Sequence, residues 1–146
     1  MTLLTWLALS AYLLAFLVVA TFAMIYVNRA RFMPYHSQAV ARPWSELDPR
    51  VQLLMLAFMR IVGWAWLAAT CAGLMFLYLV FFEFPGLLQL LGFQGFCLLM
   101  IAPVIVVSGH VQRQTGAKTP WLAGVLVALL TVAGFVVALL TGHHSL

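Results

Sequence analysis

The sequence predicts an all-α integral membrane protein, a four-transmembrane-helix bundle with up-down topology and both termini on the non-cytoplasmic side. Its 146 residues are 66% hydrophobic and only 7% charged, whereas an average soluble domain is about 25% charged. So few ionisable groups cannot cover a surface that faces water. Four apolar runs are each long enough for a helix that crosses the hydrocarbon core of a bilayer, which takes about 20 residues. The length fits one transmembrane domain over residues 1–146.

Local signals set the limits of the four expected helices. Asp48-Pro49 combines a residue that caps helix N-termini with proline at the first helical position, and Thr119-Pro120 repeats this pattern. Pro85-Gly86 predicts a tight turn between the second and third helices. The first run lacks basic residues at its start and is too long for a signal peptide. We therefore expect helices at about 3–27, 49–82, 87–109 and 120–141, with loops at 28–48 and 110–119.

The basic residues predict the orientation. Loops rich in arginine and lysine stay in the cytoplasm, so the loops 28–48 and 110–119 should be cytoplasmic and the tail with His143 and His144 outside. The excess of arginine over lysine is typical of a GC-rich bacterial genome, so we expect a multi-pass protein of the bacterial inner (cell) membrane. The residues on which this orientation depends are Arg29, Arg31, Arg42, Arg50, Arg113 and Lys118.

The second helix is too long for its span. From residue 49 to 82 it would measure about 50 Å, against a hydrocarbon core of about 30 Å. Arg60 falls near the cytoplasmic interface, where its side chain can reach the headgroups. The apolar stretch 51–59 then projects beyond the core and should lie against lipid, against the 28–48 loop or against another subunit.

Small residues predict where the helices approach each other, because close packing in lipid needs side chains that let the backbones meet. Pro103 should bend the third helix, and such a bend more often improves packing than it frames a cavity. The expected helix-packing positions are Ala65, Ala69, Gly73, Gly124, Ala128, Gly134 and Ala138.

The 28–48 loop holds the candidate site residues. Tyr35 and His36 could transfer protons if the protein is an enzyme, together with Arg60. The favoured interpretation is a membrane-surface loop with an exposed histidine and no catalytic residue. Guanidinium groups suit anions and lipid headgroups, and the candidates for such contacts are Arg29, Arg31, Arg42 and Arg60.

Other kinds of site have little support in the sequence. His36 and His110 share neither a His-x-x-x-His spacing nor an acidic neighbour, so we expect no metal and no cofactor. Cys71 and Cys97 fall at similar depths and suit packing better than a redox pair. The basic residues form no continuous stripe, so no nucleic acid is expected as a partner.

Three functions follow from this layout. The favoured one is a non-catalytic helical subunit or self-associating component of a membrane assembly, with the lipid bilayer and a homo-oligomer or other membrane subunits as partners. The first alternative is an interfacial membrane enzyme that acts on a lipid-like or thiol substrate from the cytoplasmic side. The second is a small-molecule transporter or sensor, with a cavity near Thr70, Gln94 and Pro103.

In size, helix count, outside termini and a large first cytoplasmic loop, the chain resembles the membrane-associated proteins of eicosanoid and glutathione metabolism. The resemblance is one of layout. The arginine, asparagine and glutamate pattern in the second helix of that family is absent here, where Arg60 has no matching Asn or Glu. No catalytic residue is therefore carried over.

Overall fold

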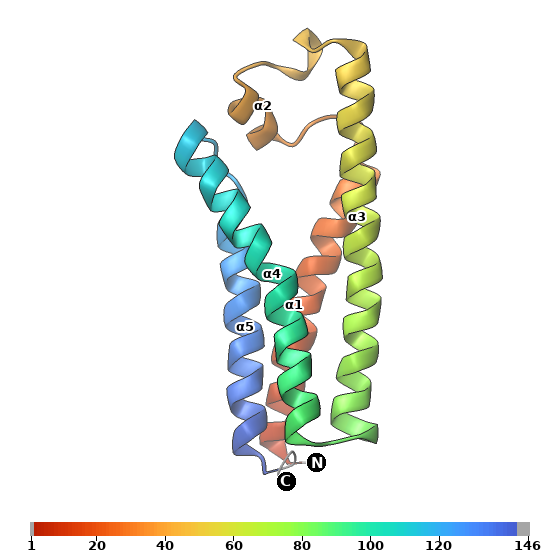
Figure 1. The fold of residues 1–146 in the computed structure, drawn as a ribbon, viewed down its shortest axis with the longest axis vertical. Helices are drawn as coiled ribbons and strands as arrows, with labels where there is room; N and C mark the ends of the chain where they lie inside the picture. The colour runs from red at the N-terminus through yellow and green to blue at the C-terminus, as the bar shows by residue number, and fades with distance from the viewer. Residues whose placement is uncertain (1, 143–146) are drawn as a thin grey trace.

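The computed structural model describes residues 2–142, and within them all regular structure is helical. Four long helices run alternately up and down (Figure 1): α1 (Leu3–Asn28), α3 (Pro49–Tyr78), α4 (Leu87–Thr115) and α5 (Trp121–Leu140). The segment η2 (Leu79–Glu83) continues α3 as a π-helix, and α2 (Pro34–Val40) and the 3-10 turn η1 (Trp44–Glu46) lie between α1 and α3. Four helical stretches are long and apolar enough to cross a membrane. This confirms the predicted four-helix membrane bundle.

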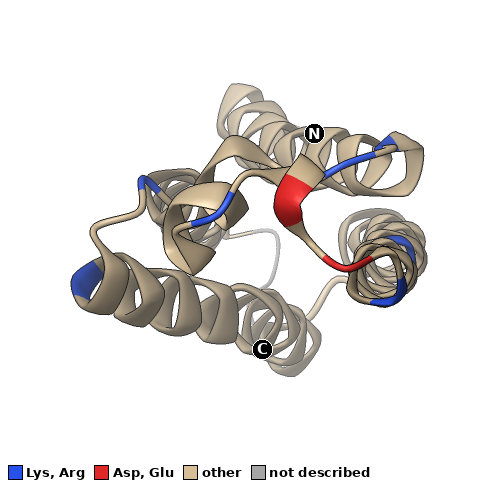
Figure 2. Cartoon of the chain, turned by 90° about the horizontal axis from the view of Figure 1, so that it is seen from above, with Lys and Arg blue, Asp and Glu red and all other residues tan. Residues whose placement is uncertain are grey.

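The two ends of the bundle differ in charge. The start of α1, the end of α5 and the turn after η2 lie at one end, and α2 lies at the other (Figure 1). We call the end with α2 the arginine-rich end, because its connections carry Arg29, Arg31, Arg42, Arg50 and Lys118. Figure 2 shows the basic positions spread around this end rather than gathered in one patch. Which end faces the cytoplasm stays a prediction, and His143 and His144 lie outside the described residues.

The helix limits follow local chemistry. The Asp48 side chain accepts a hydrogen bond of 2.8 Å from the Arg50 backbone N–H, so α3 starts where the Asp48-Pro49 signal predicts. By contrast, α4 continues past Gly109 to Thr115 and shortens the expected loop 110–119. Residues 110–115 contain neither proline nor glycine, and Gly116 ends α4 with a left-handed φ of 71°. The 28–48 loop is also more ordered than expected, because it contains α2 and η1.

The helices do not pack in chain order. α1 packs along both α3 and α5, and α5 packs along α4, whereas α3 makes few contacts with α4. Two glycines allow the close approach to α1. A Cβ atom at Gly63 of α3 would lie 2.9 Å from the Ala23 carbonyl oxygen, and one at Gly134 of α5 would lie 3.2 Å from the Ala8 carbonyl oxygen. α1 is therefore the central helix.

The predicted packing positions fall in different environments. Gly73 is buried against the Phe16 ring, and Gly124 is buried against Ile105. Gly134 and Ala138 are also buried, and Ala69 and Ala128 are half-buried. Ala65 is exposed in the single chain, because it lies on the opposite side of α3 from Gly63. The buried face of α3 has the three- and four-residue spacings of a helical face and consists of Met59, Gly63, Thr70, Gly73 and Leu77.

In the half of the bundle away from the arginine-rich end, aromatic rings fill the interior around α1, while a groove of about 380 Å³ remains between the end of α3 and the start of α4. The Tyr12 ring lies among Phe81 and Phe93, with ring centroids 6.1 and 4.9 Å away. Its hydroxyl donates a buried hydrogen bond of 2.9 Å to Oε1 of Gln94. We expected a cavity near Thr70, Gln94 and Pro103. The space beside Thr70 is only about 20 Å³, about that of one water molecule, whereas Pro103 lines a larger cavity nearer the arginine-rich end that includes neither Thr70 nor Gln94.

The cysteines do not form a pair in this structure. Both are free, and Cys97 is buried in the core of the half away from the arginine-rich end, whereas Cys71 is exposed on α3. The equal depths that the sequence predicts therefore do not bring the two sulfur atoms together.

We expect Gly63→Ala to lower the free energy of unfolding by about 1–3 kcal/mol, because its methyl group would overlap the backbone of α1. The matched control is Gly95→Ala, since a Cβ atom at Gly95 meets nothing within 4 Å. Unfolding by SDS in mixed micelles measures the difference. Equal stability of the two variants would contradict the assigned contact between α1 and α3.

We expect Tyr12→Phe to cost about 0.6–2 kcal/mol, the range for polar contacts between membrane helices. The change leaves the Gln94 amide without its partner, and the buried Nε2 of that amide already has none among residues 2–142. Tyr78→Phe is the control, because the Tyr78 hydroxyl binds Glu83 at an exposed position. The same unfolding assay applies, and an equal loss for both variants would argue against a buried role for the Tyr12 hydroxyl.

Candidate functional site

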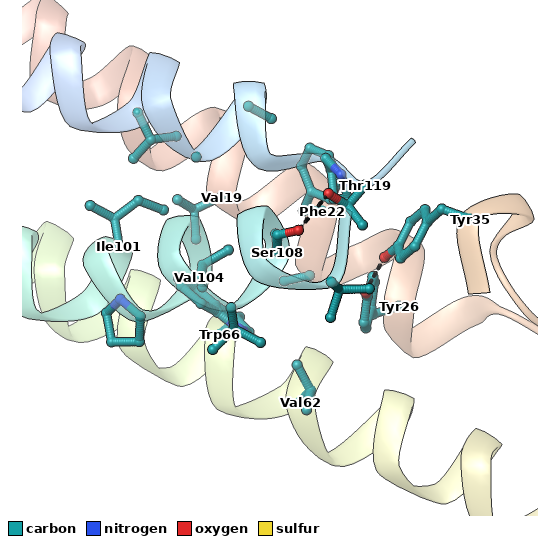
Figure 3. Close-up of a pocket in the computed structure, with 18 of the residues that line it drawn as sticks. Val19, Phe22, Tyr26, Tyr35, Val62, Trp66, Ile101, Val104, Ser108 and Thr119 are labelled. Atoms are coloured by element: carbon teal, nitrogen blue, oxygen red, sulfur yellow. Dashed lines mark hydrogen bonds between the residues drawn. The ribbon is translucent and has the colours of Figure 1, made fainter. Parts of the chain in front are cut away.

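A cavity of about 460 Å³ lies between the four long helices in the half of the bundle nearer the arginine-rich end (Figure 3). Its walls are almost entirely apolar. Each long helix contributes to them, with Phe22 from α1, Trp66 from α3, Val104 from α4 and Val127 from α5. The few polar residues that line it include Tyr26, Tyr35, His36, Ser108 and Thr119.

The bend in α4 explains why this half of the bundle is open. Pro103 lies inside α4, where proline lacks the N–H for the helical hydrogen bond and clashes with the preceding turn. Figure 1 shows the part of α4 nearer the arginine-rich end leaning away from α3. Pro103 itself lines the cavity. The bend therefore frames a cavity, in contrast to the packing role that we expected.

α2 covers the cavity at the arginine-rich end. Pro34 occupies its first turn, and the chain leaves it through Ala41, which has a left-handed φ of 52°. The Gln38 side chain accepts a hydrogen bond of 3.0 Å from the Lys118 backbone N–H and ties α2 to the connection between α4 and α5. Tyr35, His36 and Ala39 line the cavity, and their spacings of three and four residues to Ala39 place them on one face of the helix.

Tyr35 and His36 are held in an aromatic cluster. The Tyr35 hydroxyl is hydrogen-bonded to the Tyr26 hydroxyl of α1 (Figure 3). The His36 ring lies edge-on to the rings of Tyr35, Phe32 and Tyr26, at centroid distances of 4.4, 5.6 and 6.3 Å. His36 is half-buried, in contrast to the exposed position that we expected, because α2 folds back over the cavity.

Burial keeps both polar side chains uncharged. It lowers the pKa of His36, and burial, followed by the hydrogen bond to Tyr26, raises the pKa of Tyr35. The Nδ1 atom of His36 is buried and has no hydrogen-bond partner among residues 2–142. A neutral imidazole can accept a hydrogen bond through one ring nitrogen. His36 lines the cavity, and the hydrogen-bonding capacity of this ring nitrogen is not used by the described residues.

The predicted arginines do not line this cavity. Arg31, Arg42 and Arg60 are exposed. Arg29 is half-buried, its Nε donates to Sδ of Met33 at 3.1 Å, and its charge acts on Tyr35 from nearby. The structure thus brings Tyr35 and His36 together with Arg29 close to them, and it leaves the other three arginines outside. Among residues 2–142, no Lys, Arg, Asp or Glu lines the cavity.

Several residues that line the cavity were not expected from the sequence. Tyr26 lies at the end of the first apolar run, and Trp66 is an interfacial tryptophan, so both were open to an ordinary explanation as membrane-interface residues. Thr119 is fixed by a hydrogen bond of 2.9 Å from its hydroxyl to the Ser108 carbonyl oxygen. This bond connects residues on α4 and after it, so spacing along the sequence did not reveal it.

In the part of the chain that the structure describes, no group of three His, Cys, Asp or Glu residues is placed to hold a metal ion. His110 is exposed and lies outside the cavity. The cavity is therefore an apolar chamber with two tyrosine hydroxyls and one imidazole at the end that α2 covers.

Comparison with known proteins finds no matching family, no matching curated protein and no matching solved structure. The resemblance in layout to the membrane-associated proteins of eicosanoid and glutathione metabolism therefore assigns no role to any residue. The interpretation of the site depends on its own geometry.

Acidification should loosen α2. Burial lowers the pKa of His36 below its usual value of about 6.5, so the unfolded chain takes up a proton more readily than the folded chain. The stabilisation by the neutral ring is therefore complete above about pH 6.5 and decreases as the pH falls below that value. The titratable groups whose rings face His36 are Tyr26 and Tyr35, and neither is a carboxylate that could stabilise the imidazolium.

Hydrogen exchange of the amides at 35–40 measures this effect. We expect faster exchange at pH 5 than at pH 7.5 after correction for the intrinsic rate. His36→Phe should remove the pH dependence, and His110→Phe, which changes an exposed histidine, should keep it. A pH dependence that persists in His36→Phe would show that another group causes it.

Proposed function

We propose that this polytopic membrane protein is non-catalytic and binds one lipid-like small molecule in the cavity under α2. The observation that carries the proposal is the cavity of about 460 Å³ with apolar walls and a few polar groups at the end that α2 covers. Ligand pockets are mostly about 300–1,000 Å³, with apolar walls and a few polar groups that orient the ligand. In such a pocket, the walls would hold the apolar body and the end under α2 would hold the head.

Exposure of the lining residues supports access from the bilayer. Val62 of α3 and Val107 of α4 both line the cavity, yet they are 41% and 60% exposed. These two helices make few contacts with each other. The cavity therefore opens sideways between α3 and α4, and in a membrane-spanning bundle this side faces lipid. A molecule dissolved in the bilayer could enter there without crossing water.

Catalysis and transport have weaker support than ligand binding. An enzyme that uses Tyr35 and His36 would lack Arg60, whose side chain is exposed and outside the cavity. The raised pKa of Tyr35 also makes its phenolate harder to form at neutral pH. Transport needs a path to the opposite end, and the rings of Tyr12, Phe81 and Phe93 fill the bundle there. Binding, as in a sensor, fits better.

A second candidate function is self-association or membership of a membrane assembly, which a different surface favours. One face of the first turns of α3 is held against the loop before it, where Nε2 of Gln52 donates to the Trp44 carbonyl oxygen at 2.8 Å. The other face is open and apolar, with Leu54 54% and Phe58 53% exposed. Native mass spectrometry in mild detergent tests this candidate, and a monomer would argue against it.

Filling the cavity tests the proposed function. Val104→Phe places a larger side chain in the cavity, and Val106→Phe makes the same change on the same helix at a residue that is 68% exposed and outside the cavity. The probe is a tetradecyl chain with a terminal diazirine, used with the full-length protein in lipid nanodiscs. We expect Val104→Phe to reduce photolabelling of the lining segments about fivefold or more, since its ring would occupy the space of the probe.

Val106→Phe should label like the unaltered protein. Mass spectrometry of peptides from α3 and α4 gives the sites of labelling. Labelling that is equal in the two variants, or that is confined to exposed faces, would contradict a binding cavity.

A further inference from the structure

The geometry points to the chemical class of the ligand: an uncharged amphiphile with a hydrogen-bond-donating head, such as a long-chain alcohol, whose hydroxyl group donates to Nδ1 of His36. This inference rests on the proposed function and makes it more specific. It follows from three properties of the cavity, which are one buried acceptor, the absence of charged lining residues and the volume.

The acceptor is the first property. His36 lines the cavity from α2, and its Nδ1 is buried without a hydrogen-bond partner among residues 2–142. A buried polar atom without a partner is costly, so native structures rarely leave one. The hydroxyls of Tyr26, Tyr35 and Thr119 each take part in a hydrogen bond already, whereas Nδ1 of His36 takes part in none among residues 2–142. A ligand hydroxyl that donates to Nδ1 would therefore give this buried nitrogen the partner that it lacks.

The lack of charge is the second property. No Lys, Arg, Asp or Glu in the described part of the chain lines the cavity, and a charged head placed there would lose water without gaining an ion pair. Arg29 is the nearest predicted arginine, and its Nε is already directed at Sδ of Met33. A carboxylate or phosphate head is thus poorly matched, whereas a hydroxyl group needs only one acceptor.

The volume is the third property. If each non-hydrogen atom takes about the 30 Å³ that a water molecule occupies in the liquid, a cavity of about 460 Å³ holds about 15 such atoms. Tetradecanol, with its single hydroxyl, has this size. A phospholipid with two acyl chains is far too large to enter as a whole.

The experiment is competition against the tetradecyl diazirine probe in nanodiscs at pH 7.5. Three competitors share one chain and differ in their heads, namely tetradecanol, tetradecyl methyl ether and myristate. The alcohol can donate a hydrogen bond, the ether can only accept one, and myristate adds a negative charge. One net hydrogen bond between neutral groups corresponds to about a 3- to 10-fold difference in affinity. We expect tetradecanol to compete better than the ether by that factor.

Variants of His36 test whether this side chain causes the preference for the alcohol over the ether. In His36→Phe, tetradecanol and the ether should compete equally, because the phenyl ring offers the alcohol no acceptor. His36→Asn can present its carbonyl oxygen near the position of Nδ1 and should restore part of the preference for the alcohol. His110→Phe changes an exposed histidine outside the cavity and should leave the preference unchanged.

The outcomes separate this inference from the proposed function. Equal competition by the alcohol and the ether in the unaltered protein would overturn the role of His36 and leave the cavity as an apolar site. Stronger competition by myristate would overturn it in favour of an anionic head near Arg29. Probe labelling that no competitor reduces would contradict the proposed function itself. If His36→Phe fails to fold, the ratio in the unaltered protein and in His36→Asn decides.

Discussion

The close approach of α1 to α3 and α5 determines the rest of the structure. It occurs where Gly63 and Gly134 present no side chain and the backbone of α1 fills the space. In lipid, such contacts stand in for the hydrophobic effect that drives packing in water. Because α1 lies between its two neighbours, α3 is turned toward α1 and makes few contacts with α4. The cavity is the space that this arrangement leaves.

The two halves of the bundle differ in how far side chains fill the interior. In the half away from the arginine-rich end, large rings at Tyr12, Phe81 and Phe93 fill the interior, and the Tyr12–Gln94 hydrogen bond joins α1 to α4. In the other half, the lining residues do not fill the interior, and α4 leans outward beyond Pro103. Ligand binding suits the second half, because an apolar molecule there would replace the contacts that the side chains do not make.

Sequence reasoning succeeded where one segment alone decides the structure. Runs of apolar residues gave the four spans, and Asp48-Pro49 gave the start of α3, since both are local properties. It failed where several segments meet. Ala65 and Gly63 look equally suitable for packing, and only the rotation of α3 against α1 makes Gly63 the contact. The burial of His36 likewise depends on α2 folding back over the bundle and on the direction in which α4 bends.

The hydrogen bond from the Lys118 backbone to the Gln38 side chain has a mechanical consequence. It ties α2 to the connection that follows α4, and Pro103 interrupts the helical hydrogen bonding between the outer part of α4 and the remainder of that helix. A guest molecule that wedges α4 outward would thus drag α2 with it, and the arginines on either side of α2 would shift relative to the headgroups. Occupancy inside the membrane would in this way become a displacement at its surface, where a soluble partner could sense it.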